Sequence, residues 1–432
     1  MDVPRIGLYI HIPFCASKCA YCDFYSRAGC EGDMPRYQQA LRTHLRECMP
    51  RIAPAYIDTV YFGGGTPSYY GARRIAELLA EIKASGQLLR TAEITVEANP
   101  DSVTRADLRR LRHAGVNRLS IGMQSANNDI LKMIGRRHNF QQVEMAMKHA
   151  RMEGFDNVSL DLIYGLPSQS AGDWAETLAR ALELHPEHIS GYGLKLEPGT
   201  PMYELKDSPL IPDDDKQADM YLAMVETLAR YNYQQYEISN FCIPGYESRH
   251  NFKYWRLDDY MGFGPGAHSC VGNVRYSYVR DLQGYINGVL HSGDMIDEYE
   301  QIGDFERGAE YLMLGLRTVW GITKAEYQAI YHNRFDEIEQ QLLEFQQKGW
   351  ARQDNGRWHF TPEGFLLSNQ LIVKLLEAQT DRRAEQTPWL REQVEQAERE
   401  PMPAPLPATF EEQFGRQGSL RGEEPEMRNH HE

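Results

Sequence analysis

The sequence predicts an α/β fold: a parallel sheet flanked by helices, followed by a smaller α+β domain and a polar tail. From Arg5 to about Leu196, short apolar strands alternate with amphipathic helices in six successive units. Six β/α units in a row are typical of a parallel sheet, arranged either as a partial barrel or as a doubly wound sheet. The pattern changes at Gly303 and again at Thr380. The predicted segments are therefore 1–200, 201–302, 303–379 and 380–432.

The elements of the first segment can be assigned in chain order. The predicted strands are 7–12, 57–62, 93–97, 118–122, 158–163 and 189–194. The predicted helices are 37–45, 75–82, 105–113, 142–152 and 173–184. Polar residues stand where three strands end, at Glu97, Gln124 and Asp161. Because the carboxyl ends of barrel strands form the active face, we expect the functional site there.

A helix is predicted at 213–231, and the third segment reads as helix, helix, hairpin and helix. Its predicted helices are 304–319, 335–347 and 361–377, and its hairpin is 350–360. Asn355-Gly356 is a favourable tight-turn dipeptide, and Thr361 followed by Pro362 is a typical helix start. This order resembles a winged helix. Without a basic recognition face, a packing role is favoured over DNA binding.

The segment 380–432 is predicted to be a disordered tail. It holds six prolines and 19 charged residues among 53, but only six Leu, Ile, Val or Phe residues. Such a composition cannot bury enough apolar surface to offset the entropy lost on ordering. A short helix near 389–399 is the one regular element expected there.

Composition excludes several classes of protein. The formal net charge is -15, whereas a protein that binds a nucleic-acid backbone needs a basic surface. No stretch approaches the ~20 apolar residues of a membrane span, and the N-terminus lacks a signal-peptide layout. Seven cysteines, three of them within residues 15–22, fit a reducing compartment and a metal site better than disulfides. We therefore expect a cytoplasmic protein without a nucleic-acid partner.

A cysteine cluster, Cys15-x3-Cys19-x2-Cys22, directly follows the first predicted strand. Three thiolates from one loop can hold three irons of a [4Fe–4S] cluster and leave the fourth iron for a small molecule. A structural zinc site would need four ligands in paired spacings, and no second Cys-x2-Cys is present. Cys30 is an alternative fourth ligand, although its spacing is unlike that of common cluster motifs.

This spacing, with Tyr21 just before the third cysteine and Tyr9 and Phe24 flanking the loop, resembles the radical S-adenosylmethionine (SAM) superfamily. The resemblance implies a partial (β/α)6 TIM-like barrel in which Cys15, Cys19 and Cys22 hold a [4Fe–4S] cluster. It implies that SAM binds the open iron and that an electron from the cluster cleaves it to a 5′-deoxyadenosyl radical. A flavodoxin- or ferredoxin-type protein is the implied electron donor.

Further motifs follow the strands in the order that this superfamily has. Gly63-Gly64-Gly65-Thr66 comes after the second strand, where a glycine backbone permits close approach to the methionine amine. The resemblance implies that Glu97 binds the amine or a ribose hydroxyl, and that Arg136 binds the methionine carboxylate, with Arg137 as a neighbouring alternative. The full set of implied SAM-binding residues is Tyr9, Tyr21, Gly64, Gly65, Thr66, Glu97, Gln124, Arg136 and Asp161.

Within the superfamily, residues 161–169 (DLIYGLPSQ) resemble oxygen-independent coproporphyrinogen III oxidase and its sister group, the HemW heme chaperones. Asp23-Phe24 follows Cys22 where the oxidase has Gly-Cys, and few residues precede Cys15 where the oxidase has a long extension. His250-Asn-x-x-Tyr254-Trp255 matches a pattern of the chaperones. All three features favour the chaperone group.

The resemblance implies a chaperone that binds heme and passes it to an acceptor protein. His250 is the first candidate heme ligand, with Tyr254 as a flanking or alternative ligand, and His268 is the second candidate. The alternative for His250 is a histidine that packs with aromatic residues at the barrel edge. The alternative functions are porphyrinogen decarboxylation, radical modification of heme and a zinc-binding structural role.

Overall fold

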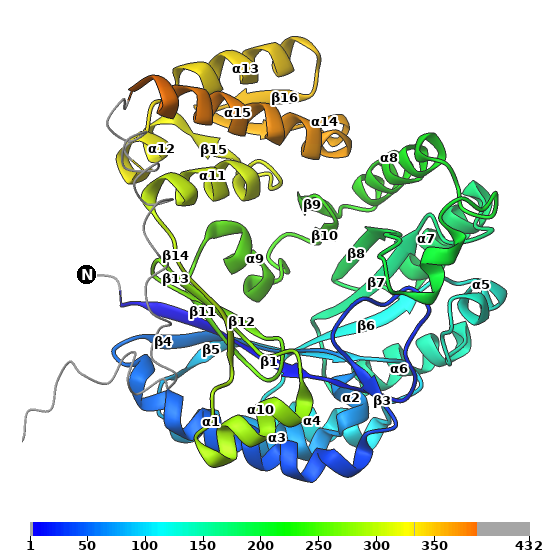
Figure 1. Ribbon diagram of the computed structural model, residues 1–432. Coiled ribbons are helices and arrows are strands. Elements are labelled where there is room, and N and C mark those ends of the chain that lie inside the picture. The colour runs from blue at the N-terminus through cyan, green and yellow to red at the C-terminus, as the bar shows by residue number, and fades with distance from the viewer. Residues whose placement is uncertain (1–2, 332, 387–432) are drawn as a thin grey trace, which may run out of the picture.

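The computed structural model describes residues 3–331 and 333–386 (Figure 1). The predicted helix near 389–399 and nearly all of the predicted tail lie outside these residues. The last helix, α15 (Ser368–Gln386), runs past the predicted domain end at residue 379. No helix in the described ranges is long and apolar enough to cross a membrane.

The predicted parallel sheet is confirmed, and it forms a partial barrel. Its predicted strands are observed as β1 (Arg5–Ile12), β4 (Tyr56–Gly64), β5 (Leu88–Ala98), β6 (Arg118–Gln124), β7 (Val158–Tyr164) and β8 (His188–Gly193). These strands are parallel neighbours in this order. The predicted helices are α1 (Met34–Ile52), α3 (Ala72–Ala84), α4 (Arg105–Ala114), α6 (Phe140–Met152) and α7 (Ala171–Glu183). Short helices α2 (Pro67–Tyr70) and α5 (Asn128–Met133) follow β4 and β6.

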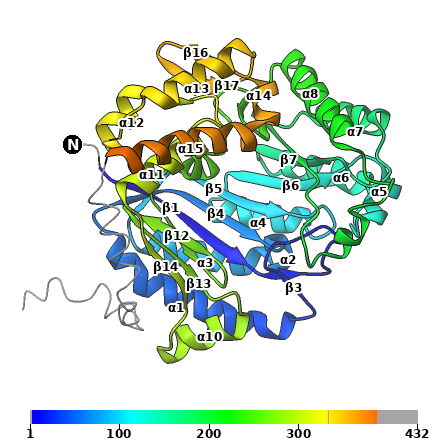
Figure 2. The same cartoon turned by 45° about the horizontal axis from the view of Figure 1, so that its top comes forward.

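The alternation of side chains along β1 explains how the barrel is layered. Leu8, Ile10 and Ile12 are completely buried, whereas Tyr9 and His11 point to the opposite face of the strand. Helices α1, α3 and α4 cover the outer face of the sheet in both views (Figure 1 and Figure 2). The apolar residues therefore face the helices, and the polar residues face the barrel interior.

The region 201–302 extends both edges of the same sheet. Strand β11 (Tyr260–Phe263) pairs in parallel with β1, and β12 (His268–Val271), β13 (Val274–Tyr278) and β14 (Ile296–Gln301) continue it antiparallel. At the other edge, β10 (Asn240–Cys242) and β9 (Gln234–Glu237) follow β8. The predicted helix 213–231 is α8 (Asp214–Arg230), and α10 (Leu282–His291) packs beside α1. The result is a twelve-stranded open sheet.

Helix α9 (Arg249–Arg256) closes the amino-terminal end of the barrel from the inside. The Glu93 carboxylate on β5 accepts hydrogen bonds from the backbone N–H groups of Arg249 and His250, at 3.1 and 3.0 Å. An acidic side chain at a helix N-terminus is favourable, because it meets the unpaired N–H groups and the helix dipole. Lys253 Nζ lies 2.9 Å from Asp58 Oδ1 on β4, and both side chains are less than 10% exposed.

The C-terminal domain has the predicted winged-helix order, with additions. Its elements are α11 (Asp304–Gly315), β15 (Ile322–Thr323), α12 (Lys324–Tyr331), α13 (Asp336–Gln347), β16 (Ala351–Asp354), β17 (Arg357–Phe360), α14 (Pro362–Leu366) and α15. The Asn355-Gly356 turn is confirmed, and both residues have positive φ. The Thr361 cap is also confirmed, because its hydroxyl accepts the Gly364 N–H at 3.1 Å.

Three predictions for this domain need correction. Helix α11 ends at Gly315 rather than at residue 319, the final helix breaks at Leu367, and the sequence did not predict α12 or β15. Strand β15 has two residues and pairs with β17 at Ile322. A two-residue strand carries no recognisable alternation, because its pairing depends on a distant partner.

Candidate functional site

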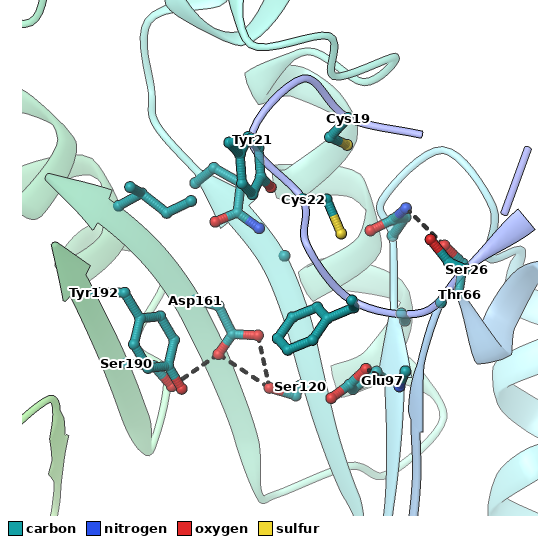
Figure 3. Close-up of a pocket in the computed structure, with 18 of the residues that line it drawn as sticks. Cys19, Tyr21, Cys22, Ser26, Thr66, Glu97, Ser120, Asp161, Ser190 and Tyr192 are labelled. Carbon is teal, nitrogen blue, oxygen red and sulfur yellow. Dashed lines mark hydrogen bonds between the residues drawn. The ribbon is translucent and has the colours of Figure 1, made fainter. Parts of the chain in front are cut away.

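A cavity of about 490 Å³ opens at the carboxyl ends of the parallel strands (Figure 3). The structure brings together eleven of the predicted site residues along its wall. They are Cys15, Cys19, Tyr21, Cys22, Gly64, Gly65, Thr66, Glu97, Gln124, Arg136 and Asp161. The predicted residues Tyr9, His250, Tyr254 and His268 are not part of this wall.

The three cysteines come from one short stretch that follows β1. Cys15 ends β2 (Phe14–Cys15), and Cys19 and Cys22 lie in the next loop, with their sulfur atoms beside the cavity (Figure 3). Thr66 Oγ1 donates a hydrogen bond to Cys15 Sγ at 3.4 Å, and Arg136 Nη1 donates to Cys19 Sγ at 3.7 Å. None of the three forms a disulfide, and burial raises the pKa of the Cys15 and Cys22 thiols.

This donor set fits an iron–sulfur cluster better than a single metal ion. In the described ranges, no three Cys, His, Asp or Glu side chains converge so that they could share one ion. A cluster instead needs one thiolate on each of three irons, and its sulfur ligands are tuned by hydrogen-bond donors. The donors Thr66 and Arg136 supply that second layer of contacts.

The glycine segment packs tightly against β1. A Cβ atom added to Gly64 would lie 2.5 Å from His11 Cε1, and one added to Gly65 would lie 2.8 Å from the Ile12 carbonyl oxygen. Gly64 also has φ of 107°, a conformation that side chains strongly disfavour. The turn itself therefore requires these glycines, and the same backbone lies open to the cavity.

Two partly buried carboxyl groups face the cavity, one from β5 and one from β7. Glu97 accepts a hydrogen bond from Tyr61 Oη at 2.8 Å and from the Gly64 N–H at 3.2 Å. Burial raises the pKa of Glu97 to about 7, and the nearby charge of Asp161 adds to this shift. Asp161 accepts hydrogen bonds from Ser120 and Ser190, each at 2.8 Å (Figure 3), and burial raises its pKa as well.

Several residues on the cavity wall have either a strained backbone or a side-chain atom without a hydrogen-bond partner among the described residues. Gln124 ends β6 with φ of 63°, and strained backbone of this kind is concentrated at ligand sites. Arg136 Nη2 donates to Asn99 Oδ1 at 2.7 Å, but its Nε has no partner among the described residues. The buried hydroxyl oxygens of Thr95 and Ser248 are unpaired in the same sense. Because buried polar groups are normally satisfied, these atoms indicate a polar ligand or ordered water in the cavity.

The sequence did not predict the polar side chains that line the barrel side of the cavity. Arg118, Ser159, His188 and Ser190 line it, all from β6, β7 and β8. His188 is hydrogen-bonded at Nδ1 to Ser159 Oγ, at 2.7 Å. The sequence contains a pattern that could have predicted them, because polar residues occupy every second position of strands that are otherwise apolar. These positions face the barrel interior.

His250 lies in the core beneath the cavity and does not reach it. Its side chain is fully buried, with Nδ1 2.8 Å from Thr59 Oγ1 and Nε2 2.9 Å from Tyr254 Oη. Burial lowers the pKa of the imidazole to about 3. Tyr9 stacks on His250 and on Tyr61, with ring centroids 6.4 and 6.2 Å apart. The contacts with Thr59 and Tyr254 occupy both ring nitrogens of His250, which matches the packing alternative for this motif.

The barrel and its three-cysteine loop are typical of one class of protein, the radical SAM superfamily. Residues 9–181 match the Radical SAM superfamily model, and residues 305–367 match the HemN C-terminal domain model. The coproporphyrinogen III oxidase HemN of Escherichia coli, described as a radical SAM enzyme, has a similar fold. Its TM-score is 0.77 at 23% identity, over 87% of this chain and 90% of that one.

Curated relatives then identify the family. The heme chaperone HemW of Bacillus subtilis is 34% identical over 375 residues, covering 85% of this chain and 98% of the relative. HemW of Escherichia coli is 35% identical over 383 residues, covering 87% and 99%. The chain belongs to the HemW family of heme chaperones.

Proposed function

We propose that this chain binds a [4Fe–4S] cluster and SAM in the barrel cavity and carries heme to an acceptor protein. The observation that carries the proposal is the near full-length similarity to curated heme chaperones, in a chain whose cavity collects the three cysteines. When bound, the cluster and SAM supply one-electron chemistry at the mouth of the barrel. Asp23-Phe24 after Cys22 supports the chaperone group over the oxidase.

The residues of the wall have complementary roles in this proposal. Cys15, Cys19 and Cys22 hold three irons. Glu97 accepts hydrogen bonds from the methionine amine, and Arg136, which is partly buried and has an unpaired Nε, pairs with the methionine carboxylate. Asp161 and Gln124 bind the ribose hydroxyls, and Thr66 holds the Cys15 sulfur through its hydroxyl group. Tyr21 packs beside the cofactor, and Gly64 and Gly65 leave room for it because they have no side chains.

SAM binding is expected to depend on pH through Glu97. Since the Glu97 pKa is raised to about 7, the carboxyl is mostly neutral below that pH and ionised above it. An amine that donates hydrogen bonds prefers the ionised carboxylate as its acceptor, so SAM should bind more tightly at about pH 8 than at about pH 6. Calorimetric titration of the reconstituted protein measures this dependence. The Glu97→Gln variant should bind SAM more weakly, and its affinity should depend less on pH. An unchanged pH dependence in this variant would show that Glu97 does not contact the amine.

Titration with hemin tests the chaperone function. The anaerobically reconstituted protein should bind hemin saturably, at one site per chain. It should also release the hemin to an apo-hemoprotein that is added in excess. Absence of saturable binding would overturn the proposal.

A further inference from the structure

The cavity continues below the proposed SAM site to a floor, where α9 closes the barrel. The cavity floor is formed by four lining residues from β5, β6 and the start of α9, namely Thr95, Arg118, Ser248 and Asn251. Strand register sets its depth, because Thr95 pairs with Arg118 while Glu97 pairs with Ser120. Two residues of a strand span about 7 Å, so the floor lies about that far below the level of Glu97.

Arg118 places a positive charge in this floor. The residue is 2% exposed, yet it lines the cavity. Two hydrogen bonds hold its guanidinium, and both use Nη1, which donates to Asn157 Oδ1 at 2.7 Å and to the Tyr246 carbonyl oxygen at 3.0 Å. Both partners are neutral, and Arg118 forms no ion pair with a described residue. A guanidinium has five donors, and a buried charge without a countercharge is costly, so this group favours an anionic ligand.

The neighbouring titratable groups do not neutralise Arg118 by contact. Asp161, closer to the cavity mouth, accepts hydrogen bonds from Ser120 and Ser190 instead, each at 2.8 Å (Figure 3). His188 adds no charge, because burial lowers its pKa well below the usual value. The guanidinium therefore remains an uncompensated cation at the end of the cavity.

Two hydroxyl groups without partners flank this cation. Thr95 is the cross-strand neighbour of Arg118, and Ser248 comes two residues after Tyr246, whose carbonyl group Arg118 binds. Thr95 and Ser248 are 0% and 2% exposed, and neither hydroxyl has a hydrogen-bond partner among the described residues. Leaving a buried hydroxyl unpaired is costly. The floor thus offers one cation and two hydroxyl donors to a single ligand.

We propose that the cavity floor binds the carboxylate group of a second, small ligand below the SAM site. One cation with neutral donors matches a single negative charge. The carboxyl groups of Glu97 and Asp161, farther up the cavity, disfavour a dianion such as phosphate. The inference goes beyond the proposed function, because it concerns a ligand other than the cluster, SAM and heme.

Acetate tests the floor, since it carries the carboxylate and little else. The reconstituted full chain is titrated with isotope-labelled acetate, and binding is followed by the line width of the nuclear magnetic resonance signal. Acetate should bind saturably, whereas acetamide, which is neutral and similar in shape, should not. Phosphate should compete less well than acetate, and acetate should stay bound when SAM is added. Displacement of acetate by SAM, or tighter binding of phosphate, would overturn the inference.

The variant Thr95→Val removes one donor from the ligand without removing a hydrogen bond of the protein. Valine has nearly the shape of threonine, and the Thr95 hydroxyl has no described partner to lose. The variant should bind acetate about tenfold more weakly. The unfolding temperature of the ligand-free protein should stay the same or rise. An acetate affinity equal to that of the wild type would contradict the assignment.

The matched control is Thr177→Val. Thr177 is a buried residue of α7 that is not among the cavity-lining residues, and its hydroxyl accepts the Ala126 N–H at 3.2 Å. This variant should lose stability and keep its acetate affinity, and an equal loss of acetate binding in both variants would overturn the inference. Arg118→Gln should abolish acetate binding, with circular dichroism as the check of folding. A folded Arg118→Gln variant with wild-type affinity would also overturn it, and Thr95→Val decides the matter if Arg118→Gln does not fold.

Discussion

Replacing Cys19 with alanine should abolish the iron–sulfur cluster while the chain stays folded. Cys19 lies in a partly exposed loop at the cavity mouth, so the lost side chain leaves no hole in the core. Without the third thiolate, one more iron lacks a protein ligand. Iron and sulfide analysis after anaerobic reconstitution should therefore fall to background, together with the visible absorbance of the cluster.

Cys30 provides the matched control. It lies beyond the same loop, with Sγ 3.6 Å from the Ala28 carbonyl oxygen, and it does not line the cavity. Cys30→Ala should keep the cluster. Loss of the cluster in Cys30→Ala, or its retention in Cys19→Ala, would contradict the assignment of ligands.

Replacing Lys253 with methionine should destabilise the protein by about 3–5 kcal/mol, because it leaves the Asp58 carboxylate buried without its countercharge. The two charged atoms are 2.9 Å apart, and Asp58 Oδ1 accepts no hydrogen bond that would replace the ion pair. The pair fixes α9 inside the barrel, next to the closely packed Gly7. Urea unfolding followed by circular dichroism gives the free energy of unfolding.

An exposed ion pair serves as the comparison. Lys132 and Asp129 lie 3.2 Å apart with side chains 77% and 87% exposed, so Lys132→Met should cost less than about 1 kcal/mol. The double variant Asp58→Leu with Lys253→Met should recover much of the lost stability, because it removes the unpaired charge. Equal effects of Lys253→Met and Lys132→Met would show that α9 is not held by this pair.

Much of the barrel could be predicted, because the sequence patterns that specify its strands and helices are local. Six strands of five or more residues each carry an apolar run, and the helices between them carry a stripe of the right period. Parallel strands bring their carboxyl ends together by geometry alone. Polar residues that stand there, such as Glu97 and Asp161, were therefore expected to lie around one cavity, and they do.

The contacts of α9 could not be predicted in the same way. His250 and Tyr254 are four residues apart and lie on one side of α9, a helix that the sequence did not predict. Which side faces the ligand depends on where the helix docks, and that is decided by Asp58 and Glu93, more than 150 residues earlier. Several strands beyond the six predicted ones were missed for a related reason, since β9, β10 and β12 have three or four residues and depend on distant partners.

The most direct measurement asks whether the reconstituted chain decarboxylates coproporphyrinogen III. The protein, SAM and a strong reductant are incubated anaerobically with this substrate, and the products are separated by chromatography, while a parallel sample is titrated with hemin. For a heme chaperone we predict bound heme and no decarboxylated porphyrinogen. Formation of that product, dependent on SAM and on Cys15, Cys19 and Cys22, would contradict the chaperone assignment and make the chain an oxidase.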